Sequence, residues 1–219
     1  MRTLAILPMK SFSQAKQRLR LELSDADRRA LVDAMFSDVL VALRRVPALE
    51  QIIVVSGDRV AQRIAQGYGA IVVEDDERGH NPAVTKGIAT ALEDGIERVL
   101  LVPGDCPLMD PNEIGQLLVH PAGERSVLVV PDRHGTGTNA LLLAPPDVMA
   151  PSFGPDSRRR HMADAAEAGV PAEVVEVACL ALDVDTPDDL EALQQRLADT
   201  RGGSAHTRGM LNQLMRARS

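Results

Sequence analysis

The chain has 219 residues, 45% of them apolar and 25% charged, a composition typical of a globular protein with one sizeable domain. Its formal net charge is −7, and it holds three Phe, one Tyr and no Trp. These numbers argue against a nucleic-acid partner, which needs a basic face or aromatic platforms. Two cysteines make no disulfide framework, and no apolar run suits a signal peptide or a membrane span. We therefore expect a cytoplasmic protein without a membrane partner.

The first half of the chain alternates between short apolar runs and segments with helical periodicity. The apolar runs are expected to be buried strands, and the periodic segments are expected to be helices packed on them. This order is typical of a three-layer α/β fold, in which a mostly parallel sheet has helices on both faces. The expected elements are strands at 3–8, 52–55, 70–73 and 99–102, with helices at about 24–46, 58–67 and 82–94 between them.

The second half is less regular but continues the same domain. No repeat or low-complexity linker divides it, so we expect one domain over residues 1–198. Residues 199–219 form a basic tail, expected to be either disordered or a docking helix. The expected elements are helices near 110–118, 158–168 and 187–198, and strands near 127–131, 139–143, 173–176 and 180–184.

Ligands in such sheets sit beyond the carboxyl ends of the strands, so the loops that follow strands are expected to carry function. The loop after the first strand holds Lys10, Lys16 and Arg18 within nine residues. These cations could surround a polyphosphate, although a solvated surface loop explains them equally well. Neither a Walker A nor a Gly-x-Gly-x-x-Gly pattern is present, which excludes a P-loop NTPase and a dinucleotide fingerprint.

The segment after the third strand is expected to start a helix. Asn81 is a good N-cap residue and Pro82 suits the first turn, so the free N–H groups of this helix would face the site. Helix N-termini attract phosphates and polar ligand edges. A purely structural helix start is the alternative interpretation.

Carboxylates are expected at the ends of two further strands. Asp105 follows the fourth strand directly, where it is well placed to hold Mg²⁺ beside a phosphate. Asp183 and Asp185 alternate in the last expected strand, so both side chains would point to one face and could approach one cation. Asp110, by contrast, is expected to cap a helix, and Cys106 to be a small core residue.

Six short motifs stand out along the chain: Lys10, Ala15 to Leu19, Gly104 to Pro107, Gly135 to Thr138, Phe153 to Ser157 and Asp183 to Pro187. Together they resemble the guanylyltransferases of coenzyme F420 biosynthesis, which act on phosphoenolpyruvate or 2-phospho-L-lactate. The resemblance covers about residues 3–190 and implies a Rossmann-like GT-A nucleotidyltransferase fold. Gly-Thr-Gly-Thr and Phe-Gly-Pro-Asp-Ser are its narrower part. The Gly-x-Gly-x-Arg opening that is usual in the wider GT-A-like group is absent.

The resemblance implies a reaction between two anions. An oxygen of the acid's phosphate attacks the α-phosphorus of GTP and pyrophosphate leaves; with phosphoenolpyruvate the product is enolpyruvyl-diphospho-guanosine. Because the nucleophile is already anionic, catalysis rests on positioning and charge neutralisation. The implied cofactor is Mg²⁺, and the implied partners are GTP and a small phosphorylated carboxylic acid. A homodimer, and hand-over of an unstable product to the next pathway enzyme, are left open.

The same resemblance implies the role of individual residues. Asp105 and Asp185 would hold the metal, with Asp183 as second choice for the latter, and Lys10, Lys16 and Asp105 would be catalytic. The acid would be bound by Thr138, Gly154 and Ser157. The implied nucleotide contacts are Pro8, Lys10, Lys16, Arg18, Gly79 and Asn81.

A basic run at the start of the helix near 158–168 points to an anion as well. Arg158, Arg159 and Arg160 stand in a first turn, where cations oppose the helix dipole, so an anionic ligand would explain them. A solvated basic face is the alternative. His161, a lone histidine, is expected at the surface.

Other functions are weighed against this one. The acceptor could be phosphoenolpyruvate, 2-phospholactate or 3-phosphoglycerate, and the bacterial character of the sequence favours phosphoenolpyruvate. A GT-A glycosyltransferase would also use the Asp-x-Asp pattern of residues 183–185, but it would release a nucleoside diphosphate. A non-catalytic nucleotide-binding module is the third alternative, although it would not need two separated metal carboxylates.

Overall fold

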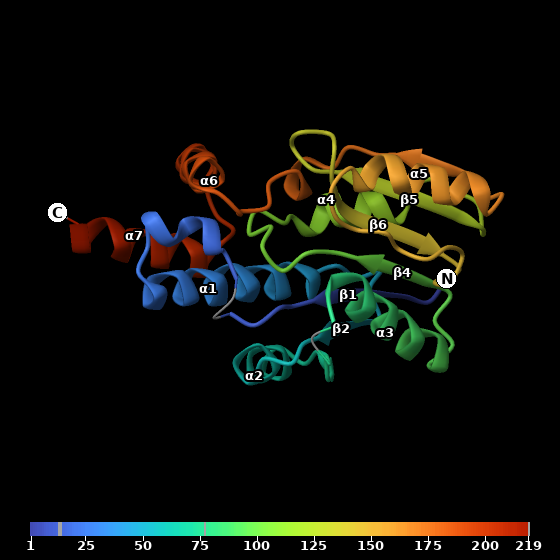
Figure 1. The fold of residues 1–219 in the computed structure, drawn as a ribbon, viewed down its shortest axis with the longest axis horizontal. Helices are drawn as coiled ribbons and strands as arrows, with labels where there is room; N and C mark the ends of the chain where they lie inside the picture. Colours follow the sequence, from blue (N-terminus) through green and yellow to red (C-terminus); the bar gives the residue numbers. More distant parts are fainter. Residues whose placement is uncertain (13–14, 77, 219) are drawn as a thin grey trace.

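One seven-stranded sheet organises the chain in the computed structural model, which describes residues 1–12, 15–76 and 78–218 (Figure 1). The strand order is β3-β2-β1-β4-β6-β5-β7, and β6 alone runs antiparallel to its neighbours β4 and β5. The strands are β1 (Thr3–Pro8), β2 (Gln51–Val55), β3 (Ile71–Val73), β4 (Arg98–Leu101), β5 (Ser126–Pro131), β6 (Thr138–Ala144) and β7 (Ala172–Val174).

Helices cover both faces of this sheet, which confirms the predicted three-layer, mostly parallel α/β architecture. Helices α3 and α5 pack on one face, and α1, α2, α4, α6 and α7 contribute to the core on the other. Their bounds are α1 (Asp25–Leu43), α2 (Arg59–Gly67), α3 (His80–Glu93), α4 (Pro111–Leu118), α5 (Ser157–Glu167), α6 (Pro187–Asp199) and α7 (Ala205–Arg218), with 3₁₀ turns η1 (Gln17–Leu21) and η2 (Ala178–Leu180).

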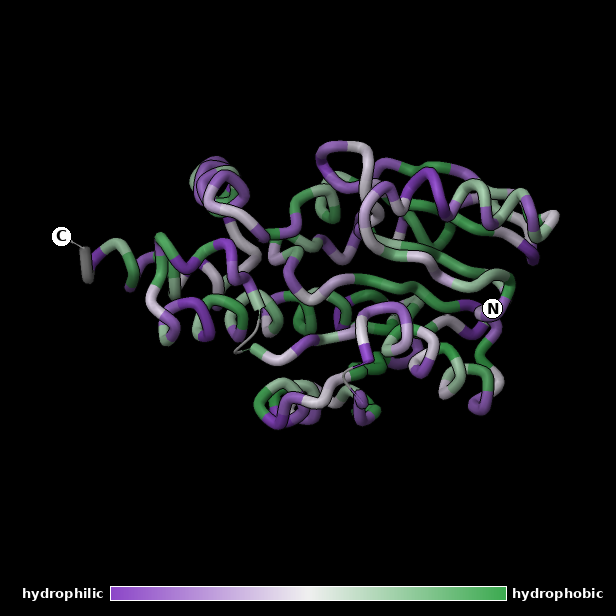
Figure 2. Tube along the Cα trace, in the orientation of Figure 1, coloured by the Kyte–Doolittle hydropathy of each residue, from purple (hydrophilic) through white to green (hydrophobic). Residues whose placement is uncertain are grey.

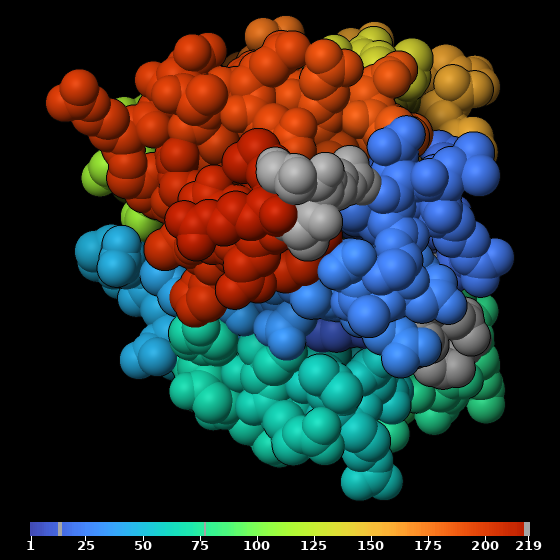
Figure 3. Space-filling view, turned by 90° about the vertical axis from the view of Figure 1, so that its left-hand side faces the viewer, coloured from blue at the N-terminus to red at the C-terminus, as the bar shows by residue number. Residues whose placement is uncertain are grey.

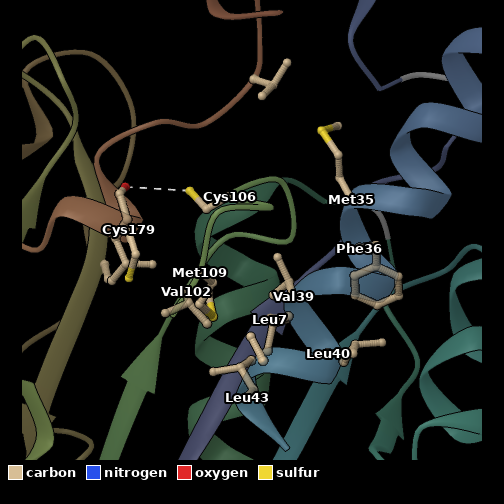
Figure 4. Close-up of a cluster of buried hydrophobic side chains, with 14 of the residues drawn as sticks. Leu7, Met35, Phe36, Val39, Leu40, Leu43, Val102, Cys106, Met109 and Cys179 are labelled. Carbon is tan, nitrogen blue, oxygen red and sulfur yellow. Dashed lines mark hydrogen bonds between the residues drawn. The ribbon is translucent and has the colours of Figure 1, made fainter. Parts of the chain in front are cut away.

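Alternation along the strands divides the core into two layers. In β1, Leu4 and Ile6 face the α3 side, whereas Ala5 and Leu7 face the α1 side, as side chains of a strand must. The strands and the inner faces of the helices are accordingly the most apolar parts of the trace (Figure 2). Figure 4 shows the α1 layer, where Leu7 lies near Phe36 and other side chains of α1.

Both cysteines belong to the α1 layer and neither is oxidised. The Sγ of Cys106 lies 3.7 Å from the carbonyl oxygen of Leu180, its hydrogen-bond acceptor (Figure 4). Burial raises the pKa of this thiol well above its ordinary value, so it stays protonated and unreactive. The expectation that Cys106 is a small core residue is thus confirmed.

One predicted helix cap and one predicted strand are wrong. Helix α3 begins at His80 with Gly79 as its N-cap, so the expected N-cap role of Asn81 is wrong. A strand at 180–184 is also wrong: the segment leaves η2 as irregular backbone, although Leu182 and Val184 are buried. The apolar alternation therefore predicted burial there but not strand pairing.

The C-terminal residues form α7, which lies against α1 (Figures 1 and 3). Leu211 and Leu214 of α7 are buried in the α1 layer. The carboxylate of Asp38, on α1, accepts hydrogen bonds from the backbone N–H groups of His206 (3.1 Å) and Thr207 (2.8 Å). A side chain of α1 thus caps the first turn of α7. Within the described ranges, no helix has both the length and the apolar character to cross a bilayer.

Candidate functional site

A cavity of about 510 Å³ opens where the carboxyl ends of β1 and β4 meet the start of β6. This is the edge at which a parallel sheet is expected to bind its ligand. Its polar lining comprises Lys10, Lys16, His80, Asp105, Asp132, Thr138, Asn139, Ser157, Asp183 and Asp185. A smaller pocket of about 180 Å³ adjoins it, shares Pro8, Lys10 and His80, and adds Asp75 and Gly79.

The ammonium group of Lys16 lies between two of the predicted metal ligands. It donates a hydrogen bond to Asp105 and another to Oδ1 of Asp185, at 2.7 Å. Only 6% of the Lys16 side chain is exposed. Burial alone would lower the pKa of Lys16, but the two carboxylates outweigh it and raise that pKa above its ordinary value. A permanent cation therefore offsets one of the two negative charges of this carboxylate pair.

Asp183 completes the acidic wall and is held by a residue that the sequence did not single out. The side-chain nitrogen of Asn139 donates to Oδ1 of Asp183 (3.2 Å) and to the carbonyl oxygen of Leu180 (2.7 Å). Burial, and then the nearby charges of Asp105 and Asp185, raise the pKa of Asp183 to about 6. The three carboxylates are therefore close enough to interact, although residues 183 and 185 do not lie on a strand.

The chemistry of this wall suits a hard divalent cation. Oδ1 of Asp105 is buried and has no hydrogen-bond partner among the residues that the structure describes, so one carboxylate oxygen is left for a ligand. Carboxylate oxygens are the ligands that Mg²⁺ prefers. Across the residues that the structure describes, no three acidic, His or Cys groups are already arranged around one metal position. The Lys16 ammonium instead holds Asp105 and Asp185 together.

The three residues predicted to bind the acid line the same cavity. Thr138 is the first residue of β6, and Ser157, only 2% exposed, is the first residue of α5. Gly154 has a φ of +127°, a backbone conformation that L side chains rarely adopt. At Gly137, a Cβ atom would lie 2.6 Å from Oδ2 of Asp132, so any other residue would require the Asp132 side chain to move.

The arginines of α5 do not play the predicted part. None of Arg158, Arg159 and Arg160 lines the cavity. Nη2 of Arg160 donates to the carbonyl oxygen of Ser152 at 2.7 Å, so this side chain braces the loop before α5. The N–H groups of Ser157 and Arg158 are also occupied, by Gly154 and Thr136 carbonyl oxygens. The N–H groups of the first two residues of this helix are therefore not free to bind a ligand.

The placement of His161 corrects another expectation. It is fully buried rather than at the surface, and its ring contacts Phe153 edge to face, with the centroids 4.9 Å apart. His80, which the sequence reasoning also missed, lies edge to face on Phe153 at 5.0 Å. Burial and the charge of Lys10 lower the pKa of His80. Two histidines and one phenylalanine therefore fill the space between α3 and α5.

The remaining predicted nucleotide residues are divided between the pockets and the surface. Pro8 and Lys10 line both pockets, and Gly79 lines the smaller one. Arg18 is exposed on η1 and lines neither. Asn81 lines neither pocket, because its side-chain amide bonds to both backbone groups of Phe153, at 2.8 and 3.1 Å.

Comparisons with known proteins agree with this geometry. The model of the family described as "Guanylyl transferase CofC like" matches residues 3–214, and thus reaches into α7. The phosphoenolpyruvate guanylyltransferase of Conexibacter woesei is 54% identical, over 99% of this chain and 98% of its own length.

Two more distant relatives carry different substrate names. The 3-phospho-D-glycerate guanylyltransferase of Colwellia psychrerythraea is 35% identical, covering 88% of this chain and 91% of its own. The 2-phospho-L-lactate guanylyltransferase of Methanothermobacter thermautotrophicus is 34% identical, covering 87% of this chain and 83% of its own length.

A solved structure supports the fold alone. The chain is similar to a nucleotide-diphospho-sugar transferase from Desulfovibrio desulfuricans G20, with a TM-score of 0.75 and 16% identity. The match covers 99% of this chain and 98% of that one.

Proposed function

Because the chain belongs to the CofC-like guanylyl transferase family, we propose that it transfers GMP from GTP to phosphoenolpyruvate in coenzyme F420 biosynthesis. The products are pyrophosphate and enolpyruvyl-diphospho-guanosine. The observation that carries this proposal is that one cavity is lined by lysines, by carboxylates and by the predicted acid-binding residues together. Such a cavity suits the meeting of two phosphorylated substrates.

The side chains of the cavity act mainly by neutralising charge. The attacking phosphate oxygen of the acid is already anionic, so no general base is needed, and the α-phosphorus of GTP is the electrophile. Lys10 and Lys16 stabilise the negative charge that spreads over the triphosphate as pyrophosphate leaves. Binding both substrates in one cavity supplies the orientation that the reaction needs.

Asp105 and Asp185, with Asp183 as the alternative to Asp185, are the residues that would hold Mg²⁺. When bound, the ion supplies charge neutralisation at the phosphates. The unpartnered Oδ1 of Asp105 supports this assignment. Lys16 holds the Asp105 and Asp185 carboxylates close together and offsets part of their charge in the absence of a metal.

The smaller pocket is where we place the guanine base, beside Pro8 and Gly79. Asp75 lines this pocket, and no hydrogen bond or ion pair engages its carboxylate within the described part of the chain. Guanine presents two adjacent N–H donors on its Watson–Crick edge, whereas adenine presents an acceptor there. A carboxylate at this position would favour GTP over ATP. Arg18 stays a predicted triphosphate contact. Asn81 is proposed to support the nucleotide site indirectly, by holding the backbone of Phe153.

Thr138, Gly154 and Ser157 are the proposed contacts to the acid. Two hydroxyl donors and a backbone turn beside the carboxylate wall suit an anionic carboxylate and phosphate. Phosphoenolpyruvate is the first choice because the 54% identical relative bears that name. The chemically similar 2-phospho-L-lactate and 3-phosphoglycerate are the alternatives. The homodimer, the product hand-over and the cytoplasmic location stay predictions.

The experiment measures pyrophosphate release by the purified protein with Mg²⁺, each of the four nucleoside triphosphates and each of the three acids. We expect release with GTP and phosphoenolpyruvate, and none when the acid or Mg²⁺ is omitted. Absence of release with all three acids would refute the proposal. Release of GDP from an added GDP-sugar, with no pyrophosphate released from GTP, would favour the glycosyltransferase alternative.

A further inference from the structure

His161 lies directly behind the acid-binding wall, and both nitrogens of its ring are engaged. Nε2 lies 2.9 Å from the backbone nitrogen of Ser152, and Nδ1 lies 3.0 Å from Oγ1 of Thr138. The ring is fully buried, so water does not compete for either nitrogen. The two contacts together determine where the ring hydrogen sits.

The backbone contact leaves only one arrangement for a neutral ring. The N–H of Ser152 can only donate, so Nε2 must be the acceptor and carries no hydrogen. The single ring hydrogen is therefore on Nδ1 and is donated to the Thr138 oxygen. The ring is neutral at ordinary pH, because burial lowers the pKa of His161 to about 4.

Ser152 itself is held in place by the same helix. Its hydroxyl donates to Oδ2 of Asp164 at 2.6 Å, and its carbonyl oxygen accepts from Arg160 at 2.7 Å. The direction of the Ser152 N–H is thus set by side chains of α5. This arrangement explains why an arginine in the first turn of α5 is useful without touching the cavity.

The tautomer of His161 determines how the Thr138 hydroxyl can form hydrogen bonds. Its oxygen already accepts the hydrogen of His161, so its own hydrogen cannot be used on that ring. No residue in the described part of the chain accepts it, and Thr138 lines the cavity. With the opposite tautomer, the hydroxyl would donate to His161 and present lone pairs to an anionic ligand.

We propose that His161 is a positioning residue, which fixes the Thr138 hydroxyl as a hydrogen-bond donor toward the anionic acid substrate. The ring never touches the substrate; it determines which way the Thr138 hydroxyl donates. The kinetic part of the test rests on the proposed function, whereas the tautomer can be measured without any substrate.

The tautomer is read from long-range ¹H–¹⁵N NMR spectra of the substrate-free protein. We expect the His161 hydrogen on Nδ1 and no titration of this ring through the neutral pH range. A hydrogen on Nε2, or a ring that titrates near pH 6.5, would overturn the inference whatever the activity of the protein.

The kinetic test compares two replacements of the same ring. His161→Asn can still donate near the Nδ1 position, whereas His161→Gln can only replace the acceptor near the Nε2 position. We expect His161→Gln to raise KM for phosphoenolpyruvate about five- to tenfold with little change in KM for GTP, and His161→Asn to recover most of that loss. His120→Gln, at a histidine that does not line the cavity, controls for histidine replacement in general.

A double-mutant cycle shows whether His161 acts through Thr138. We expect Thr138→Val to raise KM for phosphoenolpyruvate by about tenfold, and His161→Gln to add little in that background. Independent, multiplying effects would contradict the inference, and so would equal losses for GTP and the acid. If the wild-type protein releases no pyrophosphate, the proposed function fails while the NMR result still decides the tautomer.

Discussion

Lys16 is the residue that joins distant parts of the chain at the cavity. Its backbone takes a left-handed conformation, with φ of 55°, which is uncommon for a residue other than glycine. That conformation belongs to a residue whose ammonium is buried against Asp105 and Asp185, from two separate loops. We infer that the local backbone cost is offset by these ion pairs.

Asp105 is the most informative residue to change in this arrangement. Asp105→Asn removes one charge with almost no change of shape, so we expect kcat to fall by about 100- to 1000-fold while GTP binding changes by less than about threefold. Pyrophosphate release and calorimetric GTP titration measure the two quantities. Asp110→Asn is the matched control, because Asp110 caps α4 outside the cavity. Equal loss in both variants would remove Asp105 from the catalytic group.

Asp75 allows the choice of base to be tested separately. Asp75→Asn is expected to raise KM for GTP by about tenfold and to reduce the preference for GTP over ATP, because one of the two acceptors for guanine becomes a donor. Asp76→Asn serves as the control, since Asp76 faces Lys86 at 3.6 Å and lines neither pocket. An unchanged ratio of kcat/KM for GTP and ATP in Asp75→Asn would place guanine elsewhere.

The N-cap residues show which helix boundaries could be predicted from the sequence. Asp110 is the N-cap of α4, as expected, because its side chain accepts first-turn N–H groups, and Ser24 caps α1 in the same way. Gly79 is the N-cap of α3 but has no side chain that would predict this role. Asn81, two residues later, is a residue type that favours the N-cap position and therefore suggested the wrong cap. A strand at 180–184 failed because pairing depends on a neighbouring strand, which the local pattern does not reveal.

The candidate site likewise contains residues that could be predicted from the sequence and residues that could not. Lys16, Asp105 and Ser157 could be proposed because they stand in short local motifs, and the fold brings them to one cavity. Asn139 and His161 could not, since their roles depend on partners far along the chain. His161, for example, meets a hydroxyl 23 residues away, across the contact between a strand and a helix.

The packing of α3 on the sheet depends on one glycine. A Cβ atom at Gly87 would lie 2.5 Å from Cγ2 of Ile6 and 3.1 Å from Cγ2 of Val55. Gly87→Ala is therefore expected to lower the free energy of unfolding by about 1–3 kcal/mol, measured by urea denaturation. Gly115→Ala, in α4, meets nothing within 4 Å and should be neutral or stabilising by up to about 1 kcal/mol. Similar changes in both variants would show that helix propensity, and not close packing, governs the two sites.

At the scale of the whole molecule, helix α7 supports the side of the sheet that carries the cavity. Helix α7 packs across α1, and the Oγ of Ser204 just before it donates to the carbonyl oxygen of Pro107, in the loop that carries Asp105. None of the α7 residues lines either pocket. The helix is thus a support for the catalytic side of the sheet, and its docking depends on the carboxylate of Asp38.

Removing that carboxylate tests the support directly. Asp38→Ala leaves the first-turn N–H groups of His206 and Thr207 without their acceptor, so we expect the free energy of unfolding to fall by about 1–2 kcal/mol. Limited proteolysis should cut α7 faster, while kcat at 25 °C changes less than about threefold. Asp33→Ala, on the same helix, loses a 3.3 Å contact to Ser37 and should leave α7 protected. If both variants expose α7 equally, the apolar contacts of Leu211 and Leu214, and not the cap, hold the helix in place.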